Sequence, residues 1–387
     1  MFSTFFLGGF ECSTHRRPDG RRLDLLQATD HAVKAEQDYR QLSQHGIGTV
    51  RDGVRWHLIE EAPGRYDWSS VEPMLQAAER TGVQVIWDLC HYGWPDHLDI
   101  WSTEFPESFA RFAGNVARLV RRYATAPRLY CPVNEMSYWA WAGGEVGRIN
   151  PCARRRGGEL KTQLVRACMA GMDAVREADP DARFIHAEPL IHVVADPARP
   201  NDRARAEAYR QAQWEVWDIL SGKARPDLGG DISYLDVLGL NYYSDNQWYL
   251  DGSTIPCGHH AYRPLHEMLQ EVFIRYGRPL LIAETGAEGS ARPAWLHYVC
   301  QEVAAARELD VPVLGICLYP ILDYPGWSNG RLCSVGLMEA GGGSATRPIY
   351  EPLAQELQRQ QQLALEQQCP DGSAASGRRR LHPGLRS

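Results

Sequence analysis

The sequence lacks the features that mark membrane, redox-metal and nucleic-acid-binding proteins. None of its apolar runs reaches the roughly 18 residues of a membrane-spanning helix. Its ten cysteines are scattered and form no CxxC pair, so a zinc site of thiolates is not expected. Lys plus Arg number 41 against 48 Asp plus Glu, and this acidic balance argues against nucleic acid as a partner. We therefore expect neither a membrane nor a nucleic-acid partner.

The N-terminal residues also lack the signature of export. Residues 1–10 have no basic segment, and their apolar run is too short for a signal peptide. The cysteines are then expected to be reduced and the protein cytoplasmic. What the chain does have is an ordinary globular composition, 44% hydrophobic and 23% charged, which excludes a disordered or fibrous chain. Its 12 Trp and 17 Tyr are abundant, and such flat rings either stack on sugars or fill a core.

Short apolar runs alternate along the chain with longer helical stretches. The predicted strands cover residues 5–10, 48–51, 83–89, 129–133, 183–187, 235–240, 279–283 and 313–319. The predicted helices that follow them cover residues 30–45, 71–81, 107–123, 159–178, 203–220, 265–276, 293–309 and 350–367. Eight such units in order predict an α/β fold, a closed (β/α)8 TIM barrel that forms a single catalytic domain over residues 1–368. The alternative is a doubly wound open sheet, but no GxGxxG follows the first strand.

The C-terminal segment differs in composition from the rest of the chain. Residues 369–387 are rich in Gly, Ser, Pro and Arg and include Arg378-Arg379-Arg380. This composition predicts a disordered basic tail.

Polar and aromatic side chains come directly after the predicted strands. In a (β/α)8 barrel these positions line the active site at the carboxyl ends of the strands. Polar groups in such buried positions need partners, so we expect them to face one pocket. The residues are Arg51, His91, Asn134, Glu135, Asn241, Tyr243, Glu284 and Tyr319.

Two of these residues are carboxylates on opposite sides of the predicted barrel. Glu135 ends the fourth strand and Glu284 ends the seventh. Glycoside hydrolysis uses such a pair, one to protonate the leaving oxygen and one to attack or stabilise the sugar. A single Glu at a strand end is more simply a salt bridge or a helix cap, but two in matched positions favour catalysis.

The strand-end motifs resemble those of a clan A retaining glycoside hydrolase, closest to glycoside hydrolase family 1, the β-glucosidase and β-galactosidase family. Six motifs occur in the family's order. They are Arg51 with Trp56, His91 with Pro95, Val133-Asn134-Glu135, Leu238 to Tyr243, Ile282 to Gly286, and Ile321-Leu322-Asp323 with Trp327.

The chain also departs from the family pattern. Met136 replaces the proline after the acid/base Glu, Tyr92 and Tyr319 replace tryptophans, and Gly326 replaces a sugar-binding Glu. Arg16 stands where the family carries a sugar-binding Gln. An arginine there suits an anionic sugar such as a uronic acid or a sugar phosphate, and an Arg16 that points to solvent is an equal alternative.

The resemblance implies roles for the matching residues. Glu284 is the expected nucleophile, and Glu135 is the expected general acid and then general base. The expected substrate-binding residues are Arg16, His91, Asn134, Tyr243 and Trp327, and the expected supporting residues are Arg51 and Asn241. No cofactor and no metal is implied.

The predicted function is therefore a retaining β-glycosidase that hydrolyses a small β-glycoside by double displacement. The alternatives are a transglycosylase of the same fold, in which a sugar replaces water, and a non-catalytic sugar-binding barrel. A metal-dependent hydrolase would need several His or Asp ligands at strand ends, and only His91 and His186 are candidates. The sequence predicts neither the sugar nor the oligomeric state.

Overall fold

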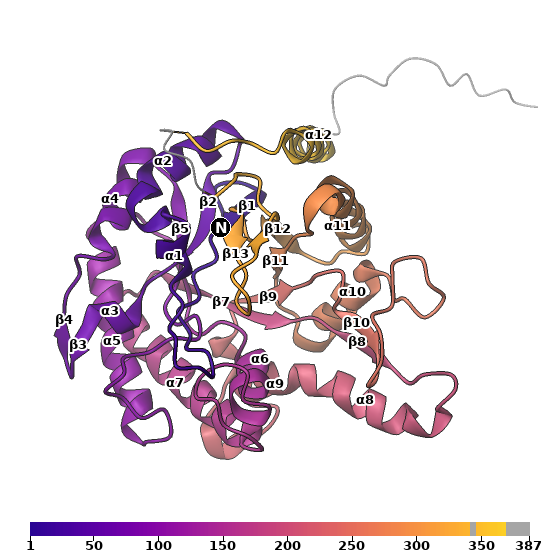
Figure 1. The fold of residues 1–387 in the computed structure, drawn as a ribbon, viewed down its shortest axis with the longest axis horizontal. Coiled ribbons are helices and arrows are strands. Elements are labelled where there is room, and N and C mark those ends of the chain that lie inside the picture. The colour runs from indigo at the N-terminus through magenta and orange to yellow at the C-terminus, as the bar shows by residue number, and fades with distance from the viewer. Residues whose placement is uncertain (341–345, 369–387) are drawn as a thin grey trace, which may run out of the picture.

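Eight parallel strands close into a barrel (Figure 1). The computed structural model describes residues 1–340 and 346–368, and the strands pair in the order β1-β12-β11-β9-β7-β6-β5-β2. Their bounds are β1 (Phe6–Gly9), β2 (Thr49–Gly53), β5 (Gln84–Asp88), β6 (Arg128–Cys131), β7 (Ala182–Pro189), β9 (Val237–Asn241), β11 (Leu280–Thr285) and β12 (Val313–Leu318). The predicted (β/α)8 architecture is confirmed, and each strand lies within two residues of its predicted position at its start.

Helices between successive strands surround the barrel (Figure 1). The longer ones are α2 (His31–Gln44), α4 (Glu72–Thr81), α5 (Glu104–Val120), α7 (Gly157–Ala178), α8 (Arg203–Gln211), α10 (Leu265–Tyr276), α11 (Arg292–Glu308) and α12 (Glu351–Gln368). Short helices are α1 (Leu25–Ala28), α3 (Trp56–Ile59), α6 (Met136–Trp139), the π-helix η1 (Ala140–Glu145) and α9 (Glu215–Leu220). Single 3-10 turns are η2 (Pro200–Asp202), η3 (Ala212–Trp214), η4 (Pro226–Leu228), η5 (Ile232–Tyr234) and η6 (Gly289–Ala291).

Three small sheets lie outside the barrel. They are β3 (Glu60–Ala62) with β4 (Arg65–Tyr66), β8 (His192–Val194) with β10 (Gln247–Tyr249), and β13 (Tyr324–Pro325) with β14 (Leu332–Cys333). All three belong to segments that follow the carboxyl ends of barrel strands, which is the end where a site is expected.

The helix predicted over residues 203–220 is interrupted. The 3-10 turn η3 separates α8 from α9 and buries Gln213 and Trp214. The Gln213 side chain accepts a hydrogen bond of 2.9 Å from the Ile191 backbone. Because that contact satisfies a backbone group in the segment after β7, the turn ties α8 to the barrel.

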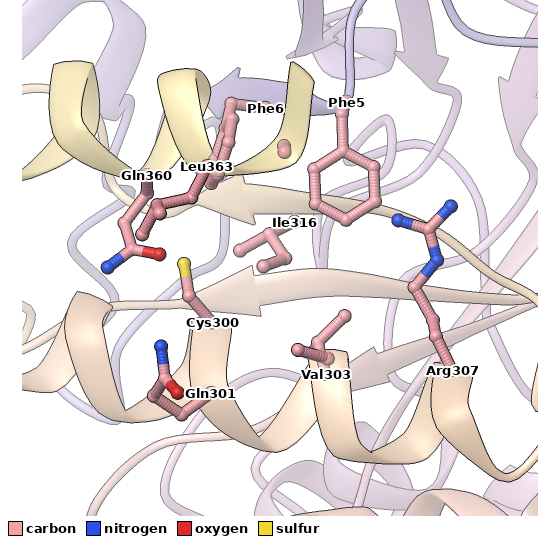
Figure 2. A pocket seen from close by; sticks show the side chains of 11 residues that line it. Phe5, Phe6, Cys300, Gln301, Val303, Arg307, Ile316, Gln360 and Leu363 are labelled. Atoms are coloured by element: carbon pink, nitrogen blue, oxygen red, sulfur yellow. The ribbon is translucent and has the colours of Figure 1, made fainter. Parts of the chain in front are cut away.

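The core has two layers, one inside the barrel and one between strands and helices. Barrel strands are buried on both faces, which explains why they read in the sequence as nearly continuous apolar runs. The inner layer includes Leu7, Ile86, Leu129, Ile185 and Leu281. On the outer side, a small cavity of about 40 Å³ lies between α11 and α12 and is lined by residues such as Phe5, Ile316 and Leu363 (Figure 2).

Two further expectations concern cysteines and termini. The nine cysteines within the described residues are all free. No helix within residues 1–340 and 346–368 is both long enough and apolar enough to cross a membrane. The predicted basic tail, residues 369–387, lies outside the described residues.

Candidate active site

A cavity of about 430 Å³ opens at the carboxyl ends of the barrel strands. Of the residues predicted from the sequence, it is lined by His91, Glu135, Tyr243, Glu284 and Trp327. These side chains come from parts of the sequence that lie far apart: Glu284 is on the seventh barrel strand, and the others follow the third, fourth, sixth and eighth. The barrel thus brings together both predicted catalytic carboxylates and three predicted sugar-binding side chains.

Arg51 links the strands behind this cavity. The Arg51 side chain is fully buried on β2. Its Nη1 donates to Oε1 of Glu284 at 2.7 Å, and its Nε and Nη2 donate to both oxygens of Asp88 at 2.8 and 2.7 Å. Nη2 also donates to Oδ1 of Asn134 at 2.6 Å. One guanidinium therefore positions three side chains from three other parts of the barrel.

Glu284 is held at both of its carboxylate oxygens. A register shift in β11 lies between Ile282 and Glu284, and such bulges re-aim the side chains next to them. The Tyr243 hydroxyl donates to Oε2 at 3.0 Å, while Arg51 binds Oε1. Burial raises the pKa of Glu284, and the adjacent guanidinium of Arg51 opposes that rise. The net result is a pKa of about 7, and within that balance the ion pair with Arg51 favours the ionised form.

Glu135 stands in a different electrostatic environment. Its backbone is left-handed, with φ of 44°, and its N–H donates to the Ala187 carbonyl at 2.9 Å. The Tyr92 hydroxyl donates to its Oε2. Burial raises the pKa of Glu135 and the nearby charge of Glu188 raises it further, whereas the hydrogen bond from Tyr92 lowers it. Among the described residues Glu135 forms no ion pair, whereas Glu284 is paired with Arg51.

Glu188 is a third carboxyl group near the site. It lies on β7, is fully buried, and accepts a hydrogen bond of 3.0 Å from the Ser137 backbone N–H. Burial raises the pKa of Glu188 to about 7. Because Ser137 lies in the first turn of α6, two residues after Glu135, this bond fixes the backbone that follows the acid. The sequence marks Glu188 only as an acidic strand-end residue with no assigned role.

Asn134 and His91 form a chain of hydrogen bonds beside Glu135. Asn134 Nδ2 lies 3.1 Å from Nε2 of His91 and donates to the Tyr92 hydroxyl at 2.9 Å. The Oδ1 of Asn134 faces Arg51, so Nδ2 is its donor and Nε2 of His91 accepts. His91 then carries its proton on Nδ1, which lies 2.9 Å from Asp88. Burial lowers the pKa of His91, but the hydrogen bond to Asp88 and the negative charges of Glu11 and Asp88 together outweigh it, and the net shift is upward.

The two predicted asparagines do not line the cavity. Asn134 is fully buried and its amide is already bound to Arg51, His91 and Tyr92, so it positions these groups. Asn241 at the end of β9 lies beside Glu135 and opposes the rise of its pKa. Neither asparagine is among the residues that line the cavity, and their expected roles stay predictions.

Aromatic rings form one wall of the cavity. The Trp327 ring lies edge-on to Tyr92, with centroids 5.8 Å apart, and 6.3 Å from Tyr138. The Nε1 of Trp327 is buried without a hydrogen-bond partner in the part of the chain that the structure describes. A flat ring with a free donor suits a sugar, which offers both an apolar face and hydroxyl acceptors.

Arg16 is not among the residues that line the cavity, and its contact with a sugar stays a prediction. Its guanidinium pairs with Asp96, with Nε 3.0 Å from Oδ1, and donates to the Gly20 carbonyl at 2.8 Å. The residue that follows β1 into the cavity is Glu11, whose carboxylate accepts from the Ser13 N–H at 3.0 Å. Glu11 comes two residues after the end of β1 at Gly9, and Arg16 comes seven residues after it. The signal for Glu11 was a polar residue directly after an apolar strand.

One side-chain group near the site has ligand atoms at metal-binding spacing. Single ligand atoms of Cys12, Asp88 and His91 lie within 4.8 Å of one another. However, both oxygens of Asp88 already accept hydrogen bonds from Arg51, and burial holds the pKa of the Cys12 thiol well above its usual range. A dication would face a buried guanidinium and a protonated thiol, so these residues fit a hydrogen-bonded support better than a metal site.

The fold and the site can now be compared with known proteins. No protein-family model matches the sequence, and no curated protein matches it. Among solved structures, a β-glucosidase from Thermotoga maritima in complex with glucoimidazole superposes with a TM-score of 0.76 at 15% identity, over 93% of this chain and 98% of that one. A family 1 β-glucosidase from the same organism gives a TM-score of 0.73 at 15% identity, over 91% and 96%. The β-glycosidase of Thermosphaera aggregans gives 0.70 at 17% identity, over 94% and 96%. The chain therefore has the (β/α)8 barrel fold of the family 1 β-glucosidases.

Proposed function

We propose that this protein is a retaining β-glycosidase that hydrolyses the O-glycosidic bond of a small β-glycoside. One observation carries the proposal. Two carboxyl groups face one cavity, and Arg51 contacts only one of them, at 2.7 Å from Glu284. A carboxyl group next to a guanidinium is favoured in its ionised form, as a nucleophile must be, and one without such a partner is favoured in its protonated form, as a general acid must be. Glycoside hydrolysis needs one group of each kind.

The reaction follows from these two environments. Ionised Glu284 attacks the anomeric carbon and forms a glycosyl ester, while protonated Glu135 gives its proton to the departing oxygen. Glu135, now ionised, then takes a proton from water as the water oxygen attacks the anomeric carbon, and the bond from that carbon to the Glu284 carboxylate breaks. Each step inverts the anomeric carbon, so the product keeps the β configuration. Arg51 and Tyr243 hold Glu284 in line throughout.

The sugar that fits this cavity is neutral. Three further acidic residues line the cavity besides the catalytic pair, namely Glu11, Asp245 and Glu288, and the described lining includes no Lys or Arg. An anionic sugar would be repelled by these carboxylates and would find no guanidinium to pair with. Since Arg16 is engaged with Asp96, the expectation of a uronic acid or a sugar phosphate loses its basis.

The test is a panel of nitrophenyl β-glycosides of neutral and anionic sugars. We expect the wild-type protein to hydrolyse at least one neutral glycoside. In Glu284→Gln the rate of hydrolysis should fall by more than about 10³-fold, because that variant cannot form the glycosyl ester. The matched control is Glu159→Gln, which removes an exposed carboxylate paired with Arg156 on α7. Near-wild-type turnover by Glu284→Gln would refute the assignment of the nucleophile.

Two further measurements separate the proposal from its alternatives. Proton NMR of the first-formed sugar is expected to show the β-anomer, and an α-anomer would mean inversion. Adding a sugar acceptor distinguishes hydrolysis from transglycosylation, since a transglycosylase would form mainly the coupled product. A protein that bound the glycosides without any turnover would be the non-catalytic barrel.

A further inference from the structure

A second, larger cavity lies next to the catalytic one. Its volume is about 560 Å³, within the range of small-molecule sites. It lies between the segment after β6, the start of α7, the β8–β10 pair and the α8–η3 segment. Figure 1 shows α8 and the β8–β10 pair on one side of the barrel, with α6 and α9 between them and its centre. Its walls are mostly apolar, and four of its residues are aromatic: Tyr138, Trp141, Tyr209 and Trp248.

The two cavities share a wall at Tyr138, which lines both. Ser137 and Tyr138 directly follow the segment of the general acid Glu135, and Ser137 also lines the second cavity. A general acid must lie beside the oxygen that it protonates, so the group attached to that oxygen departs on the side of Glu135. Ser137 and Tyr138 of the second cavity lie two and three residues after Glu135 in the chain.

The aromatic residues form two pairs of rings. Trp248 and Tyr209 meet edge to face, with centroids 6.0 Å apart and ring planes at 82°. Tyr138 and Trp141 lie 5.9 Å apart. Such faces bind flat apolar rings by stacking and by burial of apolar area.

Charged side chains around this cavity are already paired, while the buried Ser137 hydroxyl has no hydrogen-bond partner within the described residues. Lys161 and Glu215 form an ion pair of 2.5 Å, and the Glu145 carboxylate accepts from the Gly157 N–H at 3.2 Å. The Gln213 amide is bound on both sides, by the Ile191 N–H and the Arg210 carbonyl. No unpaired charge is therefore offered to a ligand by these rim residues, which favours an uncharged occupant.

We propose that this second cavity binds the leaving group of the substrate, and that this aglycone is an uncharged group with one or more aromatic rings seated against Trp248 and Tyr209. The inference rests on the proposed function, because it needs Glu135 to act as the general acid. It narrows the substrate from a small β-glycoside to a neutral sugar linked to a flat apolar aglycone.

The experiment compares a phenyl and a 4-biphenylyl β-glycoside of the same neutral sugar. The two leaving groups have nearly equal acidity, so a difference in kcat/KM reports binding of the second ring instead of bond-breaking chemistry. We expect the wild-type protein to prefer the biphenylyl glycoside. Trp248→Ala and Tyr209→Ala should each lower the biphenylyl-to-phenyl ratio about tenfold, which equals about 1.4 kcal/mol.

The chain offers a matched control and a safeguard against misfolding. Tyr249 follows Trp248 on β10, is not among the residues lining the cavity, and contacts His259 instead, so Tyr249→Ala should leave the ratio unchanged. Tyr209 is 42% exposed on α8, and its truncation carries little risk to the fold. Equal kcat/KM for the two glycosides, or a ratio that both variants leave unchanged, would overturn the inference while the proposed function stands. No hydrolysis of either glycoside would instead overturn the proposed function.

Discussion

Replacing Arg51 by methionine tests whether its charge keeps Glu284 ionised. The Nη1–Oε1 distance of 2.7 Å places the two charge centres about 4 Å apart. At an effective dielectric constant of about 20, their attraction is about 4 kcal/mol. Because each pKa unit equals about 1.36 kcal/mol, loss of Arg51 should raise the pKa of Glu284 by at most about 3. Glu284 must be ionised to attack, so the acid limb of the pH profile moves up by the same amount.

The assay is the pH dependence of kcat/KM on a dinitrophenyl β-glycoside. Such a leaving group needs little help from a general acid, so the acid limb reports Glu284 and not Glu135. Arg51→Lys serves as the matched variant, since it keeps a cation but loses the fork that holds Asp88 and Asn134. We expect its acid limb to stay close to that of the wild type while kcat falls.

Stability must be measured alongside, because Arg51→Met also leaves Asp88 without its partner. Burial opposes the ionised form of Asp88, and Arg51 together with His91 holds its pKa at about 2. Leaving one member of a buried ion pair alone costs about 3–5 kcal/mol, which urea unfolding detects. A folded Arg51→Met variant whose acid limb matches that of the wild type would refute the reasoning.

Three other predictions concern groups that surround this network. Glu135→Ala should keep most of the wild-type rate of the first chemical step on a dinitrophenyl glycoside, whereas on an alkyl glycoside that rate should fall about 10²–10⁴-fold. Pre-steady-state kinetics measure this step, and equal losses on the two substrates would contradict the proposed role of Glu135 as an acid. Glu188→Gln should move the basic limb of kcat/KM to lower pH, because the carboxylate charge that raises the pKa of Glu135 is gone; an unmoved limb would count against that effect. Burial lowers the pKa of His31, but Asp52 and Asp38 outweigh it and raise the pKa to about 9. The protonated form thus stabilises the fold by about 3 kcal/mol below pH 6.5, and this contribution is lost as the pH rises through 9. In His31→Gln, the free energy of unfolding measured with urea should depend less on pH across this range. An equally steep pH dependence in the variant would mean that other groups cause it.

The fold was predictable because the barrel strands are buried on both faces. A segment such as residues 83–89 reads as a continuous apolar run, and its helix partners carry a clear period. The break in the helix predicted over residues 203–220 was not predictable, since it depends on the contact of Gln213 with the Ile191 backbone. That contact joins two segments that are separated in the sequence, so the periodicity of apolar residues within either segment does not predict it.

The site was predictable only where a functional side chain directly follows a strand. Glu135 follows β6, and Glu284 and Arg51 lie near the carboxyl ends of β11 and β2; both carboxylates line one cavity and Arg51 lies behind it. Glu11 also follows a strand, but the choice between it and Arg16 required knowing where β1 ends. The environment of Glu188 depends on its bond to the Ser137 backbone, which no spacing in the sequence reveals.

The short segment after Glu135 has a practical consequence for redesign of substrate range. Ser137 and Tyr138 share a stretch of backbone with the acid, and that stretch is held by Glu188 and by the left-handed conformation of Glu135. Altering the second cavity from this side would disturb proton delivery together with selectivity. Tyr209 and Trp248 reach the same cavity from α8 and β10, elements that contribute no residue to the catalytic pair. Libraries that vary only those two residues should change which leaving group is accepted, while the residues proposed to cleave the bond stay unchanged.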